Sequence, residues 1–460
     1  MTKVKKKQKQ IRIKQQVNEE MPVINPNAGG IDVGASEIWV SVPPDRDAEA
    51  IRRYGVFTCD LVGMADWLKV CGITSVAMES TGVYWIPVFQ ILQSRGIEVV
   101  LVNARYAKNV SGRKSDWLDC QWLRILHSFG LLAGSFQPAA DIAVLRSYLR
   151  HRQMLIEYGA AHIEHMQKAL TQMNLQLTNV VSDITGATGM RIIRSILAGE
   201  RDPRRLAAMR DCRTKNDEET IAKALEGNYQ PEHVFALQQA VELFDFYQQK
   251  LSACDNQIAV YLSSLESRID TEVNPIPPPR AAKNKHRNAP GFDCRNEAYR
   301  ISGVDLTQIP SISESAALTI LSEIGIDMSP WKTEKHFASW LALCPNHKIT
   351  GGKIFQRSTR KSSNRIHDLL CLCAQSLFNS KTALGAFSRR MRSRLGPEKA
   401  IVATAHKLAL LIYRLLKFGK AYTDVGQEAY ETQYKERSVH NLARKAKEFG
   451  FQLVALTMEG

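Results

Sequence analysis

Residues 74–104, TSVAMESTGVYWIPVFQILQSRGIEVVLVNA, carry the pattern that decides the fold of the first part of the chain. The short apolar run at 74–80 is typical of a buried strand. Apolar residues then recur at helical spacing as far as Gly96, and 97–104 is a second buried strand. Strand, helix and strand in this order predict a mainly parallel sheet of the α/β class.

The stretch GIDVGASEIWVSVPP (30–44) precedes this unit and alternates like a strand that enters a tight glycine turn and returns as a hairpin partner. We therefore assign residues 27–140 to one α/β domain. Asp32 lies on its first strand, and Glu79 ends the strand at 74–80. Because the carboxyl ends of adjacent parallel strands face one crevice, we expect these two carboxylates to meet there.

Two further acids, Asp116 and Asp119, lie in GRKSDWLDCQWL, and their spacing places both on one face of a helix start. Four converging carboxylates repel one another unless a cation is bound between them. Mg²⁺ and Mn²⁺ prefer oxygen ligands, and two such ions assist phosphoryl transfer. The set predicts a metal-dependent, RNase H-like nuclease core. The alternative, that each acid is a surface charge or a helix cap, stays open.

The charge of the chain agrees with a nucleic-acid partner. In 460 residues, Lys and Arg outnumber Asp and Glu by 61 − 46 = 15, and nucleic acid is the commonest partner of so basic a chain. A merely basic protein remains the alternative. The nine cysteines form no C-x-x-C pair, which argues against a zinc ribbon and suits a reducing cytoplasm. No apolar run approaches the roughly 20 residues of a membrane span.

The rest of the chain divides by composition and periodicity. Apolar residues seven apart from Leu237 to Leu265, with a second set three residues later, predict a coiled-coil hairpin or a dimer contact. A Pro-rich, basic stretch without periodicity reads as a linker. The predicted divisions are a basic arm at 1–26, the α/β domain at 27–140, a helical coiled-coil region at 141–270, the linker at 271–300, a second, mostly helical domain at 301–425 and a charged helical tail at 426–460.

Three groups of basic side chains are candidates for contacts with phosphates. One precedes the acidic pair, one is interleaved along the predicted helix 146–170, and one surrounds residues 353–365. For each group a solvated surface is the competing interpretation. The candidates are Lys108, Arg113 and Lys114; Arg146, Arg150 and Arg152; and Lys353, Arg357, Arg360, Lys361 and Arg365.

The motifs IDVGASEIWV, AMESTGVYW, NARYAKNVSGRKSDWLDCQWL and LALCPNHKITGGK resemble, in order and spacing, the DEDD transposases of insertion-sequence family 110, subgroup 1111. The resemblance covers about residues 29–425. It implies a RuvC-like (RNase H-like) N-terminal domain, an α-helical coiled-coil middle and a mostly α C-terminal transposase domain. It also implies donor and target DNA as substrates, a structured guide RNA (a bridge RNA), a dimer or tetramer, and a nucleoid-associated bacterial protein.

In the family that the chain resembles, a serine followed by glycine attacks DNA and forms a covalent link. The matching residue here is Thr350, before Gly351 and Gly352 in HKITGGK. A covalent intermediate conserves the energy of the broken bond, and threonine nucleophiles exist. Three neighbouring serines remain alternatives: Ser358, Ser362 and Ser363.

Two other functions stay open at this point. Thr350 is a plain turn residue if the acids cut DNA with metal-activated water, as in a structure-selective endonuclease. A non-catalytic nucleic-acid-binding protein is the third hypothesis, and the presence of all four acids argues against it.

Two local patterns in the second domain make structural predictions. QIPSISESAALTILSEIG (308–325) has the layout of a helix-hairpin-helix, with Ser311 and Ser313 where glycines usually form the turn. Residues 360–378 predict a helix with Ser362 or Ser363 as its N-cap.

Overall fold

A computed structural model describes residues 22–80, 82–103, 116–280, 287–356, 364–419 and 422–454. The chain forms two compact units, Met1–Gln137 and Pro138–Gly460. Each unit is described by itself. Among the described residues, no helix has both the length and the apolar character that crossing a membrane requires.

A five-stranded mixed sheet forms the centre of the first unit, in the order β3-β2-β1-β4-β5. β1 pairs antiparallel with β2, which pairs antiparallel with β3, whereas β4 lies parallel to both β1 and β5. The hairpin and the strand–helix–strand unit that the sequence predicts are therefore present. The strands are β1 (Ala28–Val33), β2 (Ile38–Ser41), β3 (Ile51–Tyr54), β4 (Ser75–Glu79) and β5 (Glu98–Val102).

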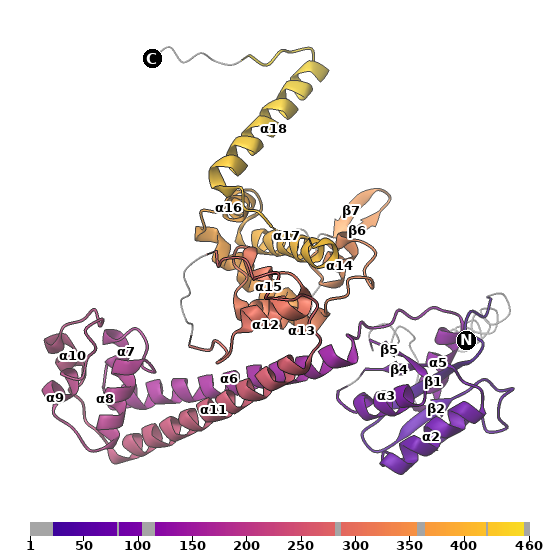
Figure 1. Ribbon diagram of the computed structural model, residues 1–460, viewed down its shortest axis with the longest axis horizontal. Helices are drawn as coiled ribbons and strands as arrows, with labels where there is room; N and C mark the ends of the chain where they lie inside the picture. Colours follow the sequence, from indigo (N-terminus) through magenta and orange to yellow (C-terminus); the bar gives the residue numbers. More distant parts are fainter. Residues whose placement is uncertain are drawn as a thin grey trace, which may run out of the picture. The chain divides into compact units, whose positions relative to one another are not determined.

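Helices cover both faces of this sheet (Figure 1). Helices α2 (Thr58–Val70) and α3 (Trp85–Ser94) pack on the face that carries Ile31 and Met78, and together they form the larger core. Helix α5 (Asp116–Ser128) packs on the other face, where Leu123 contacts Ala77 and Val102. The period-two alternation of the strands thus separates the larger apolar core from a smaller one around Ala77, Val102 and Leu123.

Two long helices, α6 (Ala140–Gln172) and α11 (Pro231–Ser264), lie side by side in the second unit (Figure 1). They run antiparallel, because Tyr148 contacts Tyr261 and Tyr158 contacts Tyr247. The predicted apolar seam of α11 therefore faces α6 of the same chain. Four short helices connect the two: α7 (Leu177–Val180), α8 (Ala187–Leu197), α9 (Pro203–Ala207) and α10 (Glu218–Ala224).

The predicted linker at 271–300 contains regular structure. Its last residues belong to α12 (Cys294–Ser302), which begins at the N-cap Asp293 and ends at Gly303 in a left-handed conformation. The guanidinium of Arg295 on this helix is buried against the carboxylate of Asp305 and also donates to the carbonyl of Pro277. The predicted boundary at residue 300 therefore falls inside a helix, which an ion pair between Arg295 and Asp305 stabilises.

The remainder of the second unit is mostly helical, with one short hairpin. Helix α17 contacts α14, α15 and α16, and α18 follows within the predicted tail. The elements are η1 (Leu306–Gln308), α13 (Glu314–Ile324), α14 (Glu334–Trp340), β6 (Lys348–Thr350), β7 (Lys353–Gln356), α15 (Arg365–Ser376), η2 (Leu377–Asn379), α16 (Ala383–Leu395), α17 (Pro397–Phe418) and α18 (Gly426–Glu448).

Candidate active site

Asp32 and Glu79 occupy equivalent positions at the ends of neighbouring strands. The parallel register of β1 and β4 pairs Ile31 with Met78, and the two acids come one residue later on each strand. Adjacent strands in a sheet lie about 4.8 Å apart, so the backbones at Asp32 and Glu79 are separated by about that distance. Since Ile31 and Met78 face the α2/α3 core, alternation directs the next residue of each strand to the opposite face, which α5 covers.

Gly30 allows α5 to approach that face closely. A Cβ atom added to Gly30 would lie 2.1 Å from the carbonyl oxygen of Cys120 and 2.4 Å from the backbone nitrogen of Arg124. Both contacts are with helix backbone, so no side-chain movement can relieve them. The absent side chain of Gly30, two residues before Asp32 on the same face, is therefore what brings α5 against β1.

Two hydrogen bonds fix the direction of α5 along the sheet. The ring Nε2 of His127 lies 2.9 Å from Oγ of Ser75 at the start of β4, and Arg124 donates to Oγ of Ser41 over 3.2 Å. From His127 back to Asp119 is about 12 Å of helix. From Ser75 to Glu79 is about 13 Å of strand. The first turn of α5 therefore lies at the level of the strand ends.

The environment of the Cys120 thiol includes Asp32 as well as Asp119. Burial, followed by the charge of the Asp32 carboxylate, raises the pKa of the Cys120 thiol to about 12, and Asp119 contributes in the same direction. A thiol with that pKa stays protonated at neutral pH. Cys120 is thus a buried thiol that packs beside Asp119 and near Asp32.

The chemistry of the acids fits a hard divalent cation, because Asp32, Glu79 and Asp119 supply carboxylate oxygens. Asp32, Glu79 and Asp119 are each half-buried. Asp116 is the first residue of α5, but its side chain lies outside the described residues, as do Lys108, Arg113 and Lys114. Within the described part of the chain, no group of three or more His, Cys, Asp or Glu side chains is close enough to hold a metal ion.

Thr350 lies in the second unit, at the tip of the β6–β7 hairpin. It pairs with Lys353 across a two-residue turn in which Gly351 and Gly352 have φ values of 55° and 76°. Positive φ at both positions is characteristic of the hairpin turn that two glycines favour. Thr350 and Lys353 are exposed, so the hydroxyl is held on a short, accessible loop.

The segment after this hairpin is described only from residue 364. Ser358, Ser362, Ser363, Arg357, Arg360 and Lys361 lie outside the described residues. The helix begins at Arg365, which is exposed, and its N-cap is Asn364, whose side chain accepts from the backbone nitrogen of Ile366. The prediction of a Ser362 or Ser363 cap is therefore wrong by one or two residues, because Asn caps equally well.

The three arginines predicted along the α6 helix have internal partners. Arg152 is 6% exposed and forms an ion pair with Asp255 of α11, which is also 6% exposed. Arg150 binds both carboxylate oxygens of Glu323, at 2.8 and 2.7 Å, and Arg146 donates to the carbonyl oxygens at the end of α13. The prediction of a phosphate track along this helix is therefore corrected: these three arginines form ion pairs that join α6 to α11 and α13.

The turn before α13 keeps a serine in an unusual conformation. Ser311 has φ 76°, in the left-handed region where glycine is favoured, and its buried Oγ has no hydrogen-bond partner among the described residues. Ser313 is the N-cap of α13 and accepts from the backbone nitrogen of Ala316 over 3.2 Å. The backbone thus has the bend expected where glycine usually stands, although the residue is serine.

Sequence reasoning missed the residues that place α5. Gly30 has no role of its own in the sequence-based predictions, although a glycine inside a strand can indicate close backbone approach. Arg124 and His127 were not singled out; they follow Cys120 at four and seven residues, which is the spacing of one helix face. That spacing was the available signal for the face that meets the sheet.

Two models of known protein families match parts of the chain. Residues 29–175 match a family model described as a transposase, the DEDD type of insertion-sequence family 110. Residues 305–389 match a second model, described as the transposase IS116/IS110/IS902 family. No curated protein matches the chain. The first match contains the strand ends and α5, and the second contains the β6–β7 hairpin. The chain therefore belongs to the transposases of insertion-sequence family 110, enzymes that act on DNA.

Proposed function

We propose that this transposase is an RNA-guided recombinase that cuts and exchanges DNA strands with carboxylate-bound metal and a threonine nucleophile. The observation that supports the proposal is the close approach of α5, the helix that carries Asp119, to β1 at Gly30. A DEDD transposase depends on a divalent metal ion. Carboxylate oxygens are suitable ligands for such an ion, and they are supplied by Asp32, Glu79 and Asp119.

We further propose that the first unit is RuvC-like. Its support is the sheet order, in which an antiparallel β1–β2–β3 meander continues into parallel β4 and β5. An RNase H-like domain has the same arrangement, with carboxylates at the strand ends. The assignment of Asp116 as the fourth acid rests on its position three residues before Asp119 at the start of α5.

The proposed chemistry gives each residue a distinct task. Asp32, Glu79, Asp116 and Asp119 hold Mg²⁺ or Mn²⁺, which when bound stabilises the charge that develops on the phosphate oxygens. The hydroxyl oxygen of Thr350 attacks phosphorus and loses its proton. The bond from phosphorus to one deoxyribose oxygen breaks, and that oxygen leaves as a hydroxyl. Attack by the hydroxyl of another strand on the phosphothreonine reverses these steps and reseals the DNA.

The partners in this proposal are donor and target DNA, a structured guide RNA and further copies of the chain as a dimer or tetramer. Support for nucleic acid comes from the net charge of +15, the exposed Lys353 of the hairpin and the exposed Arg365 at the start of α15. The guide RNA, the oligomer and a nucleoid location rest on the resemblance to the family. RNA that copurifies with the protein, with cutting lost after RNase treatment and restored by that RNA, would support guidance.

A cutting assay on supercoiled plasmid with Mg²⁺, supplemented with the copurified RNA, tests the chemistry. We expect protein–DNA adducts that resist denaturant, that vanish in Thr350→Ala and that persist in Thr350→Ser. Asp32→Ala and Glu79→Ala should abolish cutting. The matched control is Asp45→Ala, an exposed acid of the same unit. Cutting without adducts would indicate a structure-selective endonuclease that uses water, and full cutting by both acid variants would overturn the metal site itself.

A further inference from the structure

An apolar pocket opens beside the strand ends of the first unit. Its cavity volume is about 270 Å³. Residues from three separate segments form its wall: the β1–β2 turn with its flanking strand residues, the start of α2 with the segment before it, and the start of α3 with the segment before it. The residues that matter here are Val33, Gly34, Val56, Val83 and Tyr84.

The chemistry of the lining is unusual for a surface of so basic a protein. Every described residue that lines the pocket is apolar, a glycine or a tyrosine. The hydroxyl of Tyr84 is therefore the one polar side-chain group in the described lining. Val83 is 67% exposed, Tyr84 51% and Val56 39%, and the adjacent Phe57 is 75% exposed. Exposed apolar residues are ordinary when scattered, but several around one cavity mark a binding site.

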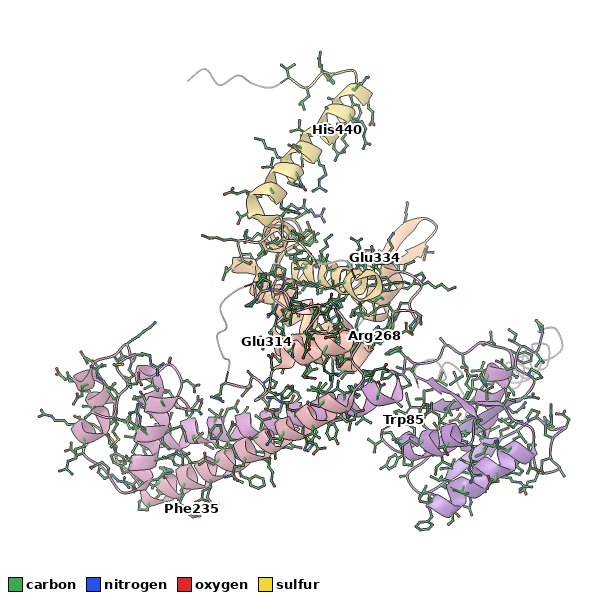
Figure 2. The ribbon with its side chains drawn as sticks, in the orientation of Figure 1. Trp85, Phe235, Arg268, Glu314, Glu334 and His440 are labelled. Atoms are coloured by element: carbon green, nitrogen blue, oxygen red, sulfur yellow. The ribbon has the colours of Figure 1, made fainter. Side chains whose placement is uncertain are left out.

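The position of the pocket connects it to the acids. Val33 follows Asp32 directly on β1, and consecutive strand residues are about 3.3 Å apart. Tyr84 is the N-cap of α3, five residues after Glu79, and Trp85 next to it is labelled in Figure 2. The pocket therefore lies at the same end of β1 as Asp32, on the face of the sheet that α2 and α3 cover.

We propose that this pocket receives one unstacked base of the DNA strand whose phosphate lies at the acids. A base has a broad apolar face, and an aromatic side chain such as that of Tyr84 binds an unstacked base by stacking. The absence of charge among the described lining residues favours the base over the phosphate or sugar. The inference rests on the proposed function, because the acids mark where the DNA backbone passes.

Photo-crosslinking of the full-length protein tests the pocket. The probe is a single-stranded 20-nucleotide thymidine oligonucleotide, about the length of two or more single-strand binding sites, with one central 5-iodouracil. We expect a crosslink on Tyr84 and a loss of affinity on the order of tenfold in Tyr84→Ala, with Tyr84→Phe close to the parent. Tyr158→Ala, which alters a residue of α6 that is also 51% exposed, is the matched control and should keep both signals.

Other outcomes would overturn the proposal. Crosslinks that map only elsewhere, together with unchanged affinity in Tyr84→Ala, would show that no base enters the pocket. If Val83→Asp instead lowers the sedimentation mass of the DNA-free protein, a second copy covers the pocket. Ala35→Trp fills the pocket from an exposed position and must reproduce the Tyr84→Ala effect, which separates occupancy from misfolding.

Glu79→Gln distinguishes the pocket from the proposed function. If this variant still cuts plasmid and still crosslinks at Tyr84, the proposed metal site is wrong and the proposed base pocket is supported. If cutting requires Glu79 but no crosslink forms at Tyr84, the pocket alone fails.

Discussion

Replacing Gly30 with alanine tests the packing that places the acids. The new Cβ would lie 2.1 Å from the carbonyl oxygen of Cys120 and 2.4 Å from the nitrogen of Arg124, both in the backbone of α5. Ordinary carbon contacts are about 3.5 Å or longer, so α5 must retreat by more than about 1 Å. Overpacking of this kind lowers the free energy of unfolding by about 1–3 kcal/mol.

The same displacement should affect activity more strongly than stability. Asp119 moves with α5, whereas Asp32 and Glu79 stay on the strands. A misplacement of about 1 Å at a reacting centre costs on the order of 100-fold in rate. Urea unfolding gives the stability, and the rate of plasmid cutting by the variant, measured where it remains folded, gives the activity.

Gly63→Ala is the matched control for this experiment. Gly63 lies in α2, and a Cβ added there meets nothing within 4 Å. Alanine in a helix interior is favoured over glycine by about 0.5–1 kcal/mol, so this variant should be slightly more stable and equally active. If Gly30→Ala matched the parent chain in both stability and cutting, the close approach of α5 would not be what assembles the site.

Three further predictions concern stability. Arg152→Met should lower the free energy of unfolding by about 3–5 kcal/mol, because it leaves the buried Asp255 carboxylate unpaired. In urea unfolding, the double variant with Asp255→Leu should recover most of this loss. If the losses of the two single variants simply added in the double variant, the result would contradict the prediction. Ser311→Gly should stabilise the chain by about 1 kcal/mol by relieving the left-handed backbone, with no gain as the contrary result. Burial lowers the pKa of His127 below its usual 6.5. As the pH falls below 6.5, the unfolded chain takes up this proton first, so the unfolding free energy should decline there; His127→Asn should flatten the decline, and an equal slope would refute the assignment.

Much of the first unit could be predicted from local pattern. The apolar runs at 74–80 and 97–104 became β4 and β5, because a strand buried on both faces needs a continuous apolar stretch. The positions of Asp32 and Glu79 at two strand ends also follow from sequence. The region 45–73 was left unassigned, although it holds β3 and α2, since its apolar residues alternate with charges.

The ion pairs of the three α6 arginines could not be predicted from local pattern. The side chains at Arg146, Arg150 and Arg152 have the spacing of a charged helix face, which fits a solvated surface or a phosphate track equally well. Their partners Asp255 and Glu323 lie more than 100 residues away in the chain. Only packing brings them together, and desolvation then makes pairing obligatory.

The ends of β1 and β4 show what the sequence determines and what the tertiary structure determines. Sequence by itself determined the strand, helix and strand of residues 74–104 and that acids end two of the strands, because these depend on periodicities of two and 3.6 residues within one segment. Tertiary structure alone decided that α5 meets β1 at Gly30, that the seam of α11 faces α6, and that three segments enclose a pocket beside Asp32. Such contacts depend on close packing between surfaces that are distant in the chain, and no local pattern specifies which surfaces will meet.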